Sequence, residues 1–398
     1  MLKVVTVQNA IETIRSACGR CTSAAETVRI ADALTRILAA DIIAQEDVPP
    51  FDRSTVDGYA VHSADTFGAG DAIPAELACV AHIQMGQPAD CSVGTGTCAG
   101  ISTGGMLPAG ADAVVMVEQT EEAFGQCLVY AGVAPGENVN QKGSDIKKGT
   151  VAVRAGTRIT PAVTGILAAL GIYEIPVCKK PVAAIISTGD EIVNTTPVSG
   201  QIRDINTYLL DACAKQAGCD TLLYGAVKDD RNRIAAAVAD CLQKADVVLI
   251  SGGSSAGAMD MTCSILDEIG EVYFHGIAVK PGKPTIFAMA DAKPVFGLPG
   301  HPLAAYFVFR LFVTEYLHTI MRKDADRPFR TARLNKNIPS NHGREELICV
   351  RIDDDGHALP LYTKSGVISV LSEADGFIRI PRESEGLPAG TEVKVYRL

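Results

Sequence analysis

The fold is decided by the stretch DVVLISGGSSAGAMDMT at residues 246–262, followed by AVKPGKP at 278–284 and FGLPGHP at 296–302. An apolar run ends in a loop of small residues, and a helix-like segment follows. Glycines at a strand-to-helix turn let backbone N–H groups approach an anion, and the N-terminus of the next helix favours negative charge. Two lysines then lie on a turn stiffened by Pro and Gly, and a second tight turn precedes another helix. Together the three pieces predict a site for a phosphorylated ligand.

Each piece alone is weakly informative. The loop is neither G-x-x-x-x-G-K-[ST] nor G-x-G-x-x-G, which disfavours the P-loop and Rossmann modes of nucleotide binding. A Gly/Ser turn between a strand and a helix can also be a plain chain reversal. The order and spacing of the three pieces therefore carry the hypothesis.

Strands and helices alternate through residues 178–326. The expected strands are PVAAIIST, TLLYGAV, DVVLIS, EVYFHGIAV and PVFGL. The expected helices cover 205–218, 230–244, 260–269 and 302–322. This alternation predicts βαβ units and a doubly wound, mostly parallel sheet. Ligands of such sheets bind beyond the carboxyl ends of the strands, where the loops at 188–191 and 251–257 should lie.

The remaining segments differ from this one in the secondary structure that their residue patterns predict. We therefore expect a multidomain α/β plus β protein. Apolar residues spaced by three and four predict helix in 1–50, which with 139–177 would form a helical or mixed linker and dimerisation domain. Residues 51–138 read as an inserted β-rich domain, and 327–398 as a small C-terminal β domain. The sequence DDDG at 353–356 predicts a hairpin turn in the latter.

Composition narrows the functional classes. The chain has 398 residues, of which 47% are hydrophobic and 21% charged, and its formal net charge is −10. That charge is unfavourable for binding nucleic acid, and an anionic small ligand would need local positive charge. No apolar run reaches 18 residues and no signal-peptide pattern is present, so we expect no membrane association and a cytoplasmic location.

The twelve cysteines are scattered, mostly in hydrophobic contexts. In a large chain of this type they are expected to be reduced and buried rather than paired in disulfides. Cys18 and Cys21 form a single C-x-x-C at the end of a helical pattern. A structural role and a redox or metal role both remain open for this pair.

Several carboxylates occupy turn or loop contexts. They are Asp57, Asp145, Glu191, Asp229 and Asp260. Oxygen ligands on loops suit Mg²⁺, which usually takes one or two protein carboxylates and completes its shell with water and phosphate. The same residues could instead be turn-formers or helix N-caps. No H-E-x-x-H, paired C-x-x-C or G-x-S-x-G is present, so a zinc hydrolase or an α/β-hydrolase has little support.

Eight motifs occur in a fixed order. They are PPFDRSTVDGYAV, ISTGGMLPAGADAVVMVE, KGSDIKKG, STGDEIV, IRDINTYLL, SGGSSAGAMD, KPGKP and GLPGHP. With them the chain resembles the molybdopterin molybdenumtransferase family, which includes bacterial MoeA and the E domain of gephyrin. The motifs extend from Pro49 to Pro302, and the β-like tail fits the family's C-terminal domain.

The resemblance implies a homodimer that takes adenylylated molybdopterin and molybdate and, with Mg²⁺, releases AMP. It implies that residues 178–326 are like the molybdopterin adenylyltransferases, and that the cleft joins this domain to the β-rich domain of the other subunit. A molybdopterin adenylyltransferase and downstream cofactor-handling proteins would be its partners.

The resemblance also implies roles for individual residues. The expected catalytic residues are Asp57, Asp145, Glu191, Asp229 and Asp260, with Glu191 and Asp260 as metal ligands. The expected pterin- and anion-binding residues are Thr103, Ser251, Gly252, Gly253, Ser255, Gly257, Lys280, Lys283, Pro299, His301 and Pro302. Anions need N–H groups and lysines, and cleavage of a phosphoanhydride needs charge stabilisation by a metal held by carboxylates.

Three positions depart from the family pattern. Ala258 stands where many relatives have an acidic residue, His301 stands in P-G-H-P where P-G-N-P is usual, and Gly105 stands where T-G-A is usual. Loss of one carboxylate could weaken metal binding. Two other functions stay open: a molybdopterin adenylyltransferase, which would leave the motifs outside 178–326 idle, and a non-catalytic pterin-binding scaffold. The choice between molybdate and tungstate is also open.

Overall fold

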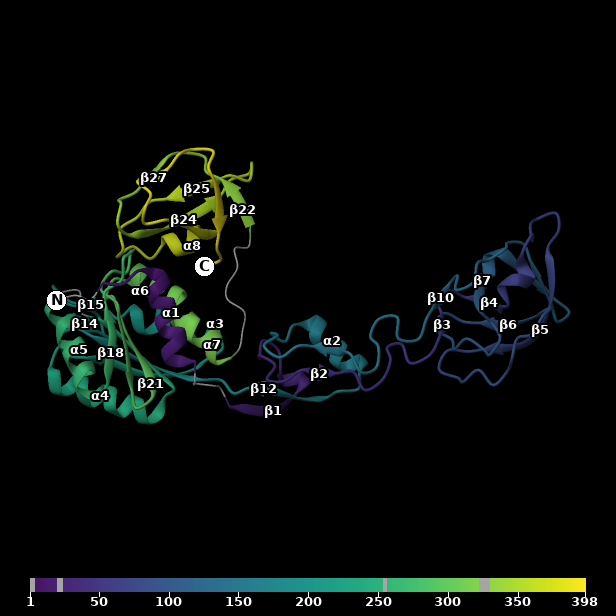
Figure 1. The fold of residues 1–398 in the computed structure, drawn as a ribbon, viewed down its shortest axis with the longest axis horizontal. Helices are drawn as coiled ribbons and strands as arrows, with labels where there is room; N and C mark the ends of the chain where they lie inside the picture. Colours follow the sequence, from purple (N-terminus) through teal and green to yellow (C-terminus); the bar gives the residue numbers. More distant parts are fainter. Residues whose placement is uncertain (1–3, 20–23, 253–255, 322–329) are drawn as a thin grey trace.

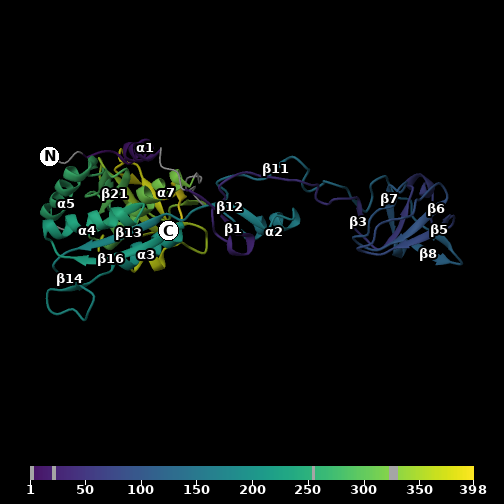
Figure 2. The same cartoon turned by 90° about the horizontal axis from the view of Figure 1, so that it is seen from below.

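The computed structural model describes residues 4–19, 24–252, 256–321 and 330–398. The chain is elongated: an α/β unit and a C-terminal β domain lie at one end, a β-rich domain lies at the other, and a narrower segment joins them (Figures 1 and 2). Among the described residues, no helix is both long enough and apolar enough to cross a bilayer.

The α/β unit contains a six-stranded sheet. Its strands, in spatial order, are β16 (Asp220–Val227), β13 (Val182–Thr188), β17 (Val247–Gly252), β21 (Lys293–Leu298), β20 (Ile286–Ala290) and β18 (Glu271–His275). The first four are parallel, and β20 and β18 run antiparallel to their neighbours. The predicted doubly wound, mostly parallel sheet is therefore confirmed, although β20 was not predicted. The expected strand EVYFHGIAV is interrupted after His275 and resumes as β19 (Val279–Lys280).

Helices cover both faces of this sheet. They are α3 (Asn206–Ala217), α4 (Arg231–Lys244), α5 (Ala256–Ile269), α6 (Pro302–Val308) and α7 (Thr314–Ile320). Alternate residues of β13 and β17 enter two separate cores: Ile185 and Leu249 pack with α3, α6 and α7, whereas Ile186 and Ile250 pack with α4 and α5. This alternation is what a sheet buried on both faces requires. The helix predicted over 302–322 contains a π-helical turn at Phe309–Val313 between α6 and α7.

The helical prediction for residues 1–50 is correct only for α1 (Val7–Cys18), whose N-cap Thr6 accepts a hydrogen bond from the N–H of Asn9. Beyond it, β1 (Ala25–Arg29) is a strand that pairs antiparallel with β12 (Glu174–Cys178). The apolar spacing was misleading because Leu34 is 55% exposed and the apolar pattern forms no buried helical face. Pairing with a distant strand overrides a local helical pattern.

The helix α1 packs on the α/β unit and not on the linker. Val7, Ala10 and Ile14 are buried in the same core as Phe312, and the Arg15 guanidinium lies 2.5 Å from a carboxylate oxygen of Glu315. Residues 1–50 are thus divided between two parts of the molecule. We retain the remaining divisions, 51–138, 139–177, 178–326 and 327–398, as a proposed domain description.

The linker is a small packed unit of β1, β12, β2 (Ile42–Ile43), β11 (Val151–Val153) and α2 (Pro161–Ala169). Pro161 stands in the first turn of α2, and the Thr160 side chain caps the helix by accepting from the N–H of Val163. Leu38, Leu167 and Val177 are among the fully buried residues of its core.

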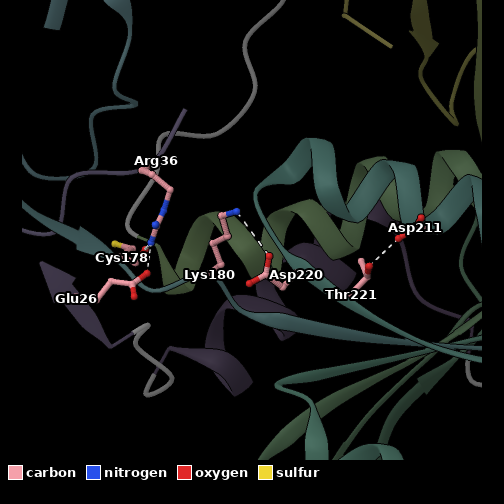
Figure 3. Close-up of polar contacts among 7 residues, drawn as sticks. All are labelled: Glu26, Arg36, Cys178, Lys180, Asp211, Asp220 and Thr221. Atoms are coloured by element: carbon pink, nitrogen blue, oxygen red, sulfur yellow. Dashed lines mark hydrogen bonds and ion pairs between the residues drawn. The ribbon is translucent and has the colours of Figure 1, made fainter. Parts of the chain in front are cut away.

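Polar contacts fix the chain where the linker enters the α/β unit (Figure 3). The Arg36 guanidinium forms an ion pair with Glu26 and donates to the carbonyl of Cys178 at 2.8 Å. Just beyond, Lys180 lies 3.6 Å from Asp220 at the start of β16. The Arg36 contacts hold two segments of the linker together, and the Lys180 ion pair ties the chain that leaves the linker to the edge strand β16.

The β-rich domain contains a second six-stranded sheet. Its spatial order is β7 (Ala113–Met116), β4 (Gly58–Val61), β6 (Thr97–Ile101), β5 (Ala75–Ile83), β9 (Gln126–Val129) and β8 (Thr120–Ala123). A short pair, β3 (Arg53–Ser54) with β10 (Val139–Asn140), joins the chain entering the domain to the chain leaving it. The β-rich character predicted for 51–138 is confirmed.

The C-terminal domain is β-rich as predicted. Its elements are β22 (Arg330–Arg333), β23 (Ile338–Pro339), β24 (Glu345–Ile352), β25 (Ala358–Leu361), α8 (Val370–Glu373), β26 (Gly376–Ile380), β27 (Gly386–Leu387) and β28 (Glu392–Val395). Residues 353–356 form the predicted turn, with Gly356 at φ +80° between the antiparallel strands β24 and β25. The strand β19 of the α/β unit pairs with β24, so one sheet spans both parts.

Candidate functional site

The predicted anion-binding loop at residues 251–257, which we call the anion cradle, begins at the carboxyl end of β17. The Ser251 hydroxyl accepts a hydrogen bond from Asn206 Nδ2 at 2.7 Å and lies 3.5 Å from the Pro299 carbonyl oxygen. A Cβ on Gly252 would lie 2.0 Å from Thr188 Oγ1 and 2.3 Å from the Thr188 carbonyl oxygen. Only glycine lets the two strand ends come this close, which explains the residue type at this position.

The structure places the remaining loop residues only in part. Gly253 and Ser255 lie outside the described residues, and Gly257 lies in the first turn of α5. Pro299 directly follows β21, and its carbonyl oxygen lies next to the Ser251 hydroxyl. Pro302 is the first residue of α6. The predicted helix start at the second tight turn is confirmed.

A buried polar network stands beside the cradle. The Asp204 carboxylate accepts from the Ser187 hydroxyl at 3.0 Å and from the hydroxyl of Thr207 at 2.6 Å. Asn206 donates to the carbonyl of Gly300 at 2.9 Å, while its Oδ1 is a buried acceptor without a hydrogen-bond partner among the described residues. Buried acceptors are normally satisfied, so this oxygen has room for a donor that the described residues do not supply. The motif IRDINTYLL contains Asp204, Asn206 and Thr207, yet none of the three was assigned to the site.

Acidic side chains gather at the end of the neighbouring strand β13. The pKa of Asp229 is raised by burial and by the negative charges of Asp190 and Glu191. The Asp229 N–H donates to the Asp190 carboxylate at 3.3 Å, and Glu191 folds back over Gly189, whose absent Cβ would lie 2.8 Å from Glu191 Oε2. The predicted residues Glu191 and Asp229 are therefore brought together. A bound cation would relieve their mutual repulsion. Among the described residues, however, Asp190, Glu191 and Asp229 do not place three ligand atoms within 4.8 Å of one another, so their side chains would have to close around an ion.

Asp260 is exposed on α5. Its carboxylate lies 4.0 Å from His275 Nε2 at the end of β18. Burial lowers the pKa of His275, and the charge of Asp260 opposes this effect. No local sequence pattern indicates His275. Among the described residues, Asp260 and Glu191 do not belong to one compact group of three metal-ligating side chains.

A cavity of about 800 Å³ opens between the α/β unit and the C-terminal domain. Of the predicted residues, it is lined by Lys280, Lys283, Pro299 and His301. The C-terminal domain adds Arg344, Glu346, Lys364 and Ser365, which were not predicted. The two sides are connected by an ion pair of 2.7 Å between Lys280 and Glu346 and by a contact of 3.0 Å between His301 Nδ1 and Ser365 Oγ.

The cavity wall is cationic although the chain is acidic overall. Among the described residues that line it are three lysines and one arginine, and the only acidic one is Glu346, which already neutralises Lys280. Among the described residues, Lys283 forms no ion pair, and its side chain is exposed. This surface supplies the local positive charge that a net charge of −10 made necessary for an anionic ligand.

The other predicted residues lie in the arm of the molecule, by which we mean the β-rich domain and the linker strands that lead to it and back. The Asp57 carboxylate accepts from the N–H of Thr103 at 2.7 Å and from its hydroxyl at 3.1 Å. The adjacent Gly58 permits β7 to approach, because a Cβ there would lie 1.8 Å from the Val115 carbonyl oxygen. Asp145 is exposed in the chain returning from the β-rich domain, and its N–H donates to Val48.

The candidate residues therefore form two groups within one chain. Asp57 and Thr103 lie in the β-rich domain, next to the strands β4 and β6, at the far end of the molecule from β18, β21 and α5 of the α/β unit (Figure 1). One chain alone does not bring them to the cationic cavity.

Family models match three consecutive parts of the sequence. They are the MoeA N-terminal region (domain I and II) at 5–171, the probable molybdopterin binding domain at 184–319 and the MoeA C-terminal region (domain IV) at 331–398. The chain belongs to the MoeA family. The molybdopterin molybdenumtransferase of Bacillus subtilis is 34% identical over 391 residues, which cover 93% of this chain and 89% of that protein.

Solved MoeA structures have the same fold. A molybdopterin biosynthesis MoeA protein from Pyrococcus horikoshii is 39% identical, with a TM-score of 0.83 and 99% coverage of both chains. A second structure of that name, from strain OT3, is 32% identical, with a TM-score of 0.88 over the whole of both chains. The resemblance inferred from the eight motifs is confirmed.

Proposed function

We propose that this protein is a molybdopterin molybdenumtransferase, an enzyme of molybdenum cofactor biosynthesis. The observation that carries the proposal is the cationic cavity beside the anion cradle of β17, in a chain matched by MoeA family models along nearly its whole length. The curated relative from Bacillus subtilis has the same activity in its name. The proposed substrates are adenylylated molybdopterin and molybdate, and AMP is released.

We assign each group of site residues a role that follows from its chemistry. The Ser251–Gly252 strand end offers backbone groups close to a phosphate, and the buried Asn206 Oδ1 offers an acceptor to a polar ring. Lys283 and Arg344 supply positive charge in the cavity, where phosphate and molybdate oxygens would lie. No protein nucleophile is needed, because an oxygen of molybdate or water can attack phosphorus.

Magnesium is the proposed cation, held by the carboxylates of Glu191 and Asp229 near Asp190. Burial, and then the charges of Asp190 and Glu191, raise the pKa of Asp229, and a divalent cation would offset this cost of ionisation. When bound, Mg²⁺ would neutralise charge on the phosphate oxygens. Asp260 would contribute from α5, where Ala258 leaves it without an acidic neighbour two residues before it.

We further propose a homodimer, in which the β-rich domain of each subunit approaches the α/β unit of the other. The separation of Asp57 and Thr103 from the cavity within one chain supports this arrangement (Figure 1). A cytoplasmic location is also proposed, since buried free thiols such as Cys213 and Cys241 suit a reducing compartment. The adenylylated substrate would come from a molybdopterin adenylyltransferase.

The decisive experiment measures AMP release by purified protein given adenylylated molybdopterin and Mg²⁺, with molybdate or tungstate in separate reactions. Oxyanion-dependent AMP release is expected, and the two reactions give the metal preference. Binding of the pterin without AMP release in either reaction would contradict the enzyme and favour a scaffold. Consumption of ATP with free molybdopterin would favour an adenylyltransferase.

A matched pair of variants tests the α5 carboxylate. Asp260→Asn should lower AMP release at least tenfold while pterin binding survives, because charge stabilisation is worth more during phosphoanhydride cleavage than in the ground state. Asp267→Asn, exposed on the same helix, should retain activity. Ala258→Asp should lower the Mg²⁺ concentration required. Equal activity of the two Asn variants would remove Asp260 from the mechanism.

A further inference from the structure

A second cluster of metal-ligating side chains lies in the β-rich domain. Cys79 and His82 on β5 and Glu122 on β8 place one ligand atom each so that all three atoms lie within 4.8 Å of one another. Cys79 Sγ is 3.7 Å from His82 Nε2, and His82 Nε2 is 3.4 Å from Glu122 Oε1. These strands lie together at the end of the arm (Figure 2).

The distances match those that a metal would impose. Zinc binds sulfur at about 2.3 Å and nitrogen or oxygen at about 2.0–2.2 Å in tetrahedral geometry. These lengths require about 3.6 Å between a sulfur and a nitrogen ligand, and about 3.4 Å between a nitrogen and an oxygen ligand. Two of the three ligand separations therefore match those around a shared zinc ion, and the third, between Cys79 and Glu122, is below 4.8 Å.

Neighbouring residues hold the ligands in place. The Tyr59 hydroxyl donates to Glu122 Oε2, which leaves Oε1 directed at His82. The His82 ring lies over Gly100 of β6, where a Cβ would come within 2.2 Å of Nδ1. Outer contacts of this kind commonly orient metal ligands.

The environment of Cys79 is rich in sulfur. Cys79 pairs in register with Cys98 on β6, and both Cys98 and Cys127 are fully buried. The hydrogen bond with Cys127, and then burial, raise the pKa of Cys98. The half-buried Cys79, next to an exposed histidine, is the sulfur positioned to ligate a metal.

We propose that Cys79, His82 and Glu122 form a zinc site with three protein ligands and a fourth position open to water. Mixed sulfur, nitrogen and oxygen donors select Zn²⁺ over Mg²⁺, which prefers oxygen. The His82 side chain is 63% exposed, so solvent reaches the cluster. The site is separate from the cationic cavity and does not depend on the function proposed for it.

Cobalt can test the site, because Co²⁺ bound to a thiolate gives a charge-transfer band in the near ultraviolet. The full chain is stripped with a chelator and titrated with Co²⁺, and Zn²⁺ binding is measured by calorimetry. One equivalent of each ion and a thiolate–cobalt band are expected for the wild type. Cys79→Ser should abolish the band, and His82→Gln should weaken Zn²⁺ binding at least about tenfold.

Matched controls come from the same domain. Cys91→Ser and His62→Gln should leave the band and the affinity unchanged, because neither residue belongs to the cluster. His82→Gln changes an exposed side chain, so it tests the site even if Cys79→Ser impairs folding. A wild type without the band, or a band that survives Cys79→Ser but disappears in Cys18→Ala, would overturn the proposal. Zn²⁺ affinity unchanged by His82→Gln would do the same.

Discussion

At the scale of single residues, Asp229 has a measurable consequence for stability. Its pKa is raised in the folded protein, so its stabilising contribution is present below the ordinary Asp pKa and is lost as pH rises through the folded value. At neutral pH its ionised form therefore opposes folding. Asp229→Asn should raise the free energy of unfolding at pH 7 by up to about 0.5 kcal/mol in metal-free protein.

Urea unfolding at pH 7 and near pH 3.5 checks this sign. The gain should shrink at the lower pH, where the wild-type carboxyl is also protonated. Asp267→Asn on α5 is the control, with no gain expected at either pH. A loss of stability in Asp229→Asn at neutral pH would show that the carboxylate is compensated by a contact other than a bound metal.

Lys283 tests the cationic wall. Since Lys280 already pairs with Glu346, Lys283 is the lysine of the turn whose charge is available to a phosphate. Lys283→Ala should weaken binding of adenylylated molybdopterin by about 1.5–3 kcal/mol, the range for a hydrogen bond to a charged group. Calorimetry measures the affinity, with Lys394→Ala on β28 as an exposed control. Unchanged affinity would place the ligand away from this lysine.

The loops that contribute to the site could be predicted from the residue types at their turns. The side chains that these loops contact in the folded protein could not. The motifs predicted the loops that contain Ser251, Lys283 and His301, and these loops lie around one sheet edge and one cavity. Arg344 and Ser365 were missed because they carry no local pattern and reach the cavity through tertiary packing. The same is true of His275 opposite Asp260.

At the scale of elements, the junction of β13 and β17 depends on a missing side chain. Gly252→Ala would place a Cβ 2.3 Å from the Thr188 carbonyl oxygen, so the strand ends must separate. We expect a loss of about 1–3 kcal/mol in the free energy of unfolding of the α/β unit. Thermal denaturation measures it.

Gly165 provides the opposite substitution. It lies in the interior of α2, and a Cβ there would meet nothing within 4 Å. Gly165→Ala should therefore stabilise the linker by about 0.5–1 kcal/mol. If both alanine variants behaved alike, the close approach at Gly252 would not be what requires glycine there.

Element prediction succeeded where the signal is local and failed where it is not. The strands β13, β16 and β17 and the helices α3 and α4 are contiguous patterns bounded by turn residues, such as the Asp230 cap of α4. β20 was missed because IFAMA is a short apolar run without helical or strand periodicity. β1 was mistaken for helix because its pairing with β12 spans almost 150 residues of sequence.

At the scale of the whole molecule, the separation of the two residue groups predicts complementation. A heterodimer of an Asp57→Ala subunit and an Asp260→Ala subunit would have one cleft with both lesions and one with neither. AMP release should recover to about half of the wild-type rate, whereas each mutant homodimer remains impaired. Differently tagged subunits, purified in tandem, provide the sample.

The control is a heterodimer in which one subunit carries both substitutions. Each of its clefts would then contain one lesion, so activity should stay low. Verified heterodimers of the first kind without any recovery would mean that each cleft is built from one chain, and the proposed arrangement of the dimer would have to be abandoned.

The order of α/β and β-rich segments along the chain could be predicted from changes in the residue pattern. The packing of α1 on the α/β unit could not. The helix α1 belongs to the α/β unit, and its contact between Arg15 and Glu315 joins residues 300 apart. No pattern within α1 indicates which distant surface covers its apolar face. Only the assembled core of Ile14 with Phe312 reveals it.

The packing of α1 has a consequence for folding during translation. The helix α1 is synthesised before the arm, yet α7, against which it packs, emerges some 300 residues later. At translation speeds of about 5–20 residues per second, its apolar face waits roughly 15–60 s for a partner. The arm can fold during this interval, since its strands pair among themselves. The nascent chain thus carries an uncovered amphipathic helix throughout most of its synthesis, and we expect this segment to be where chaperones engage it.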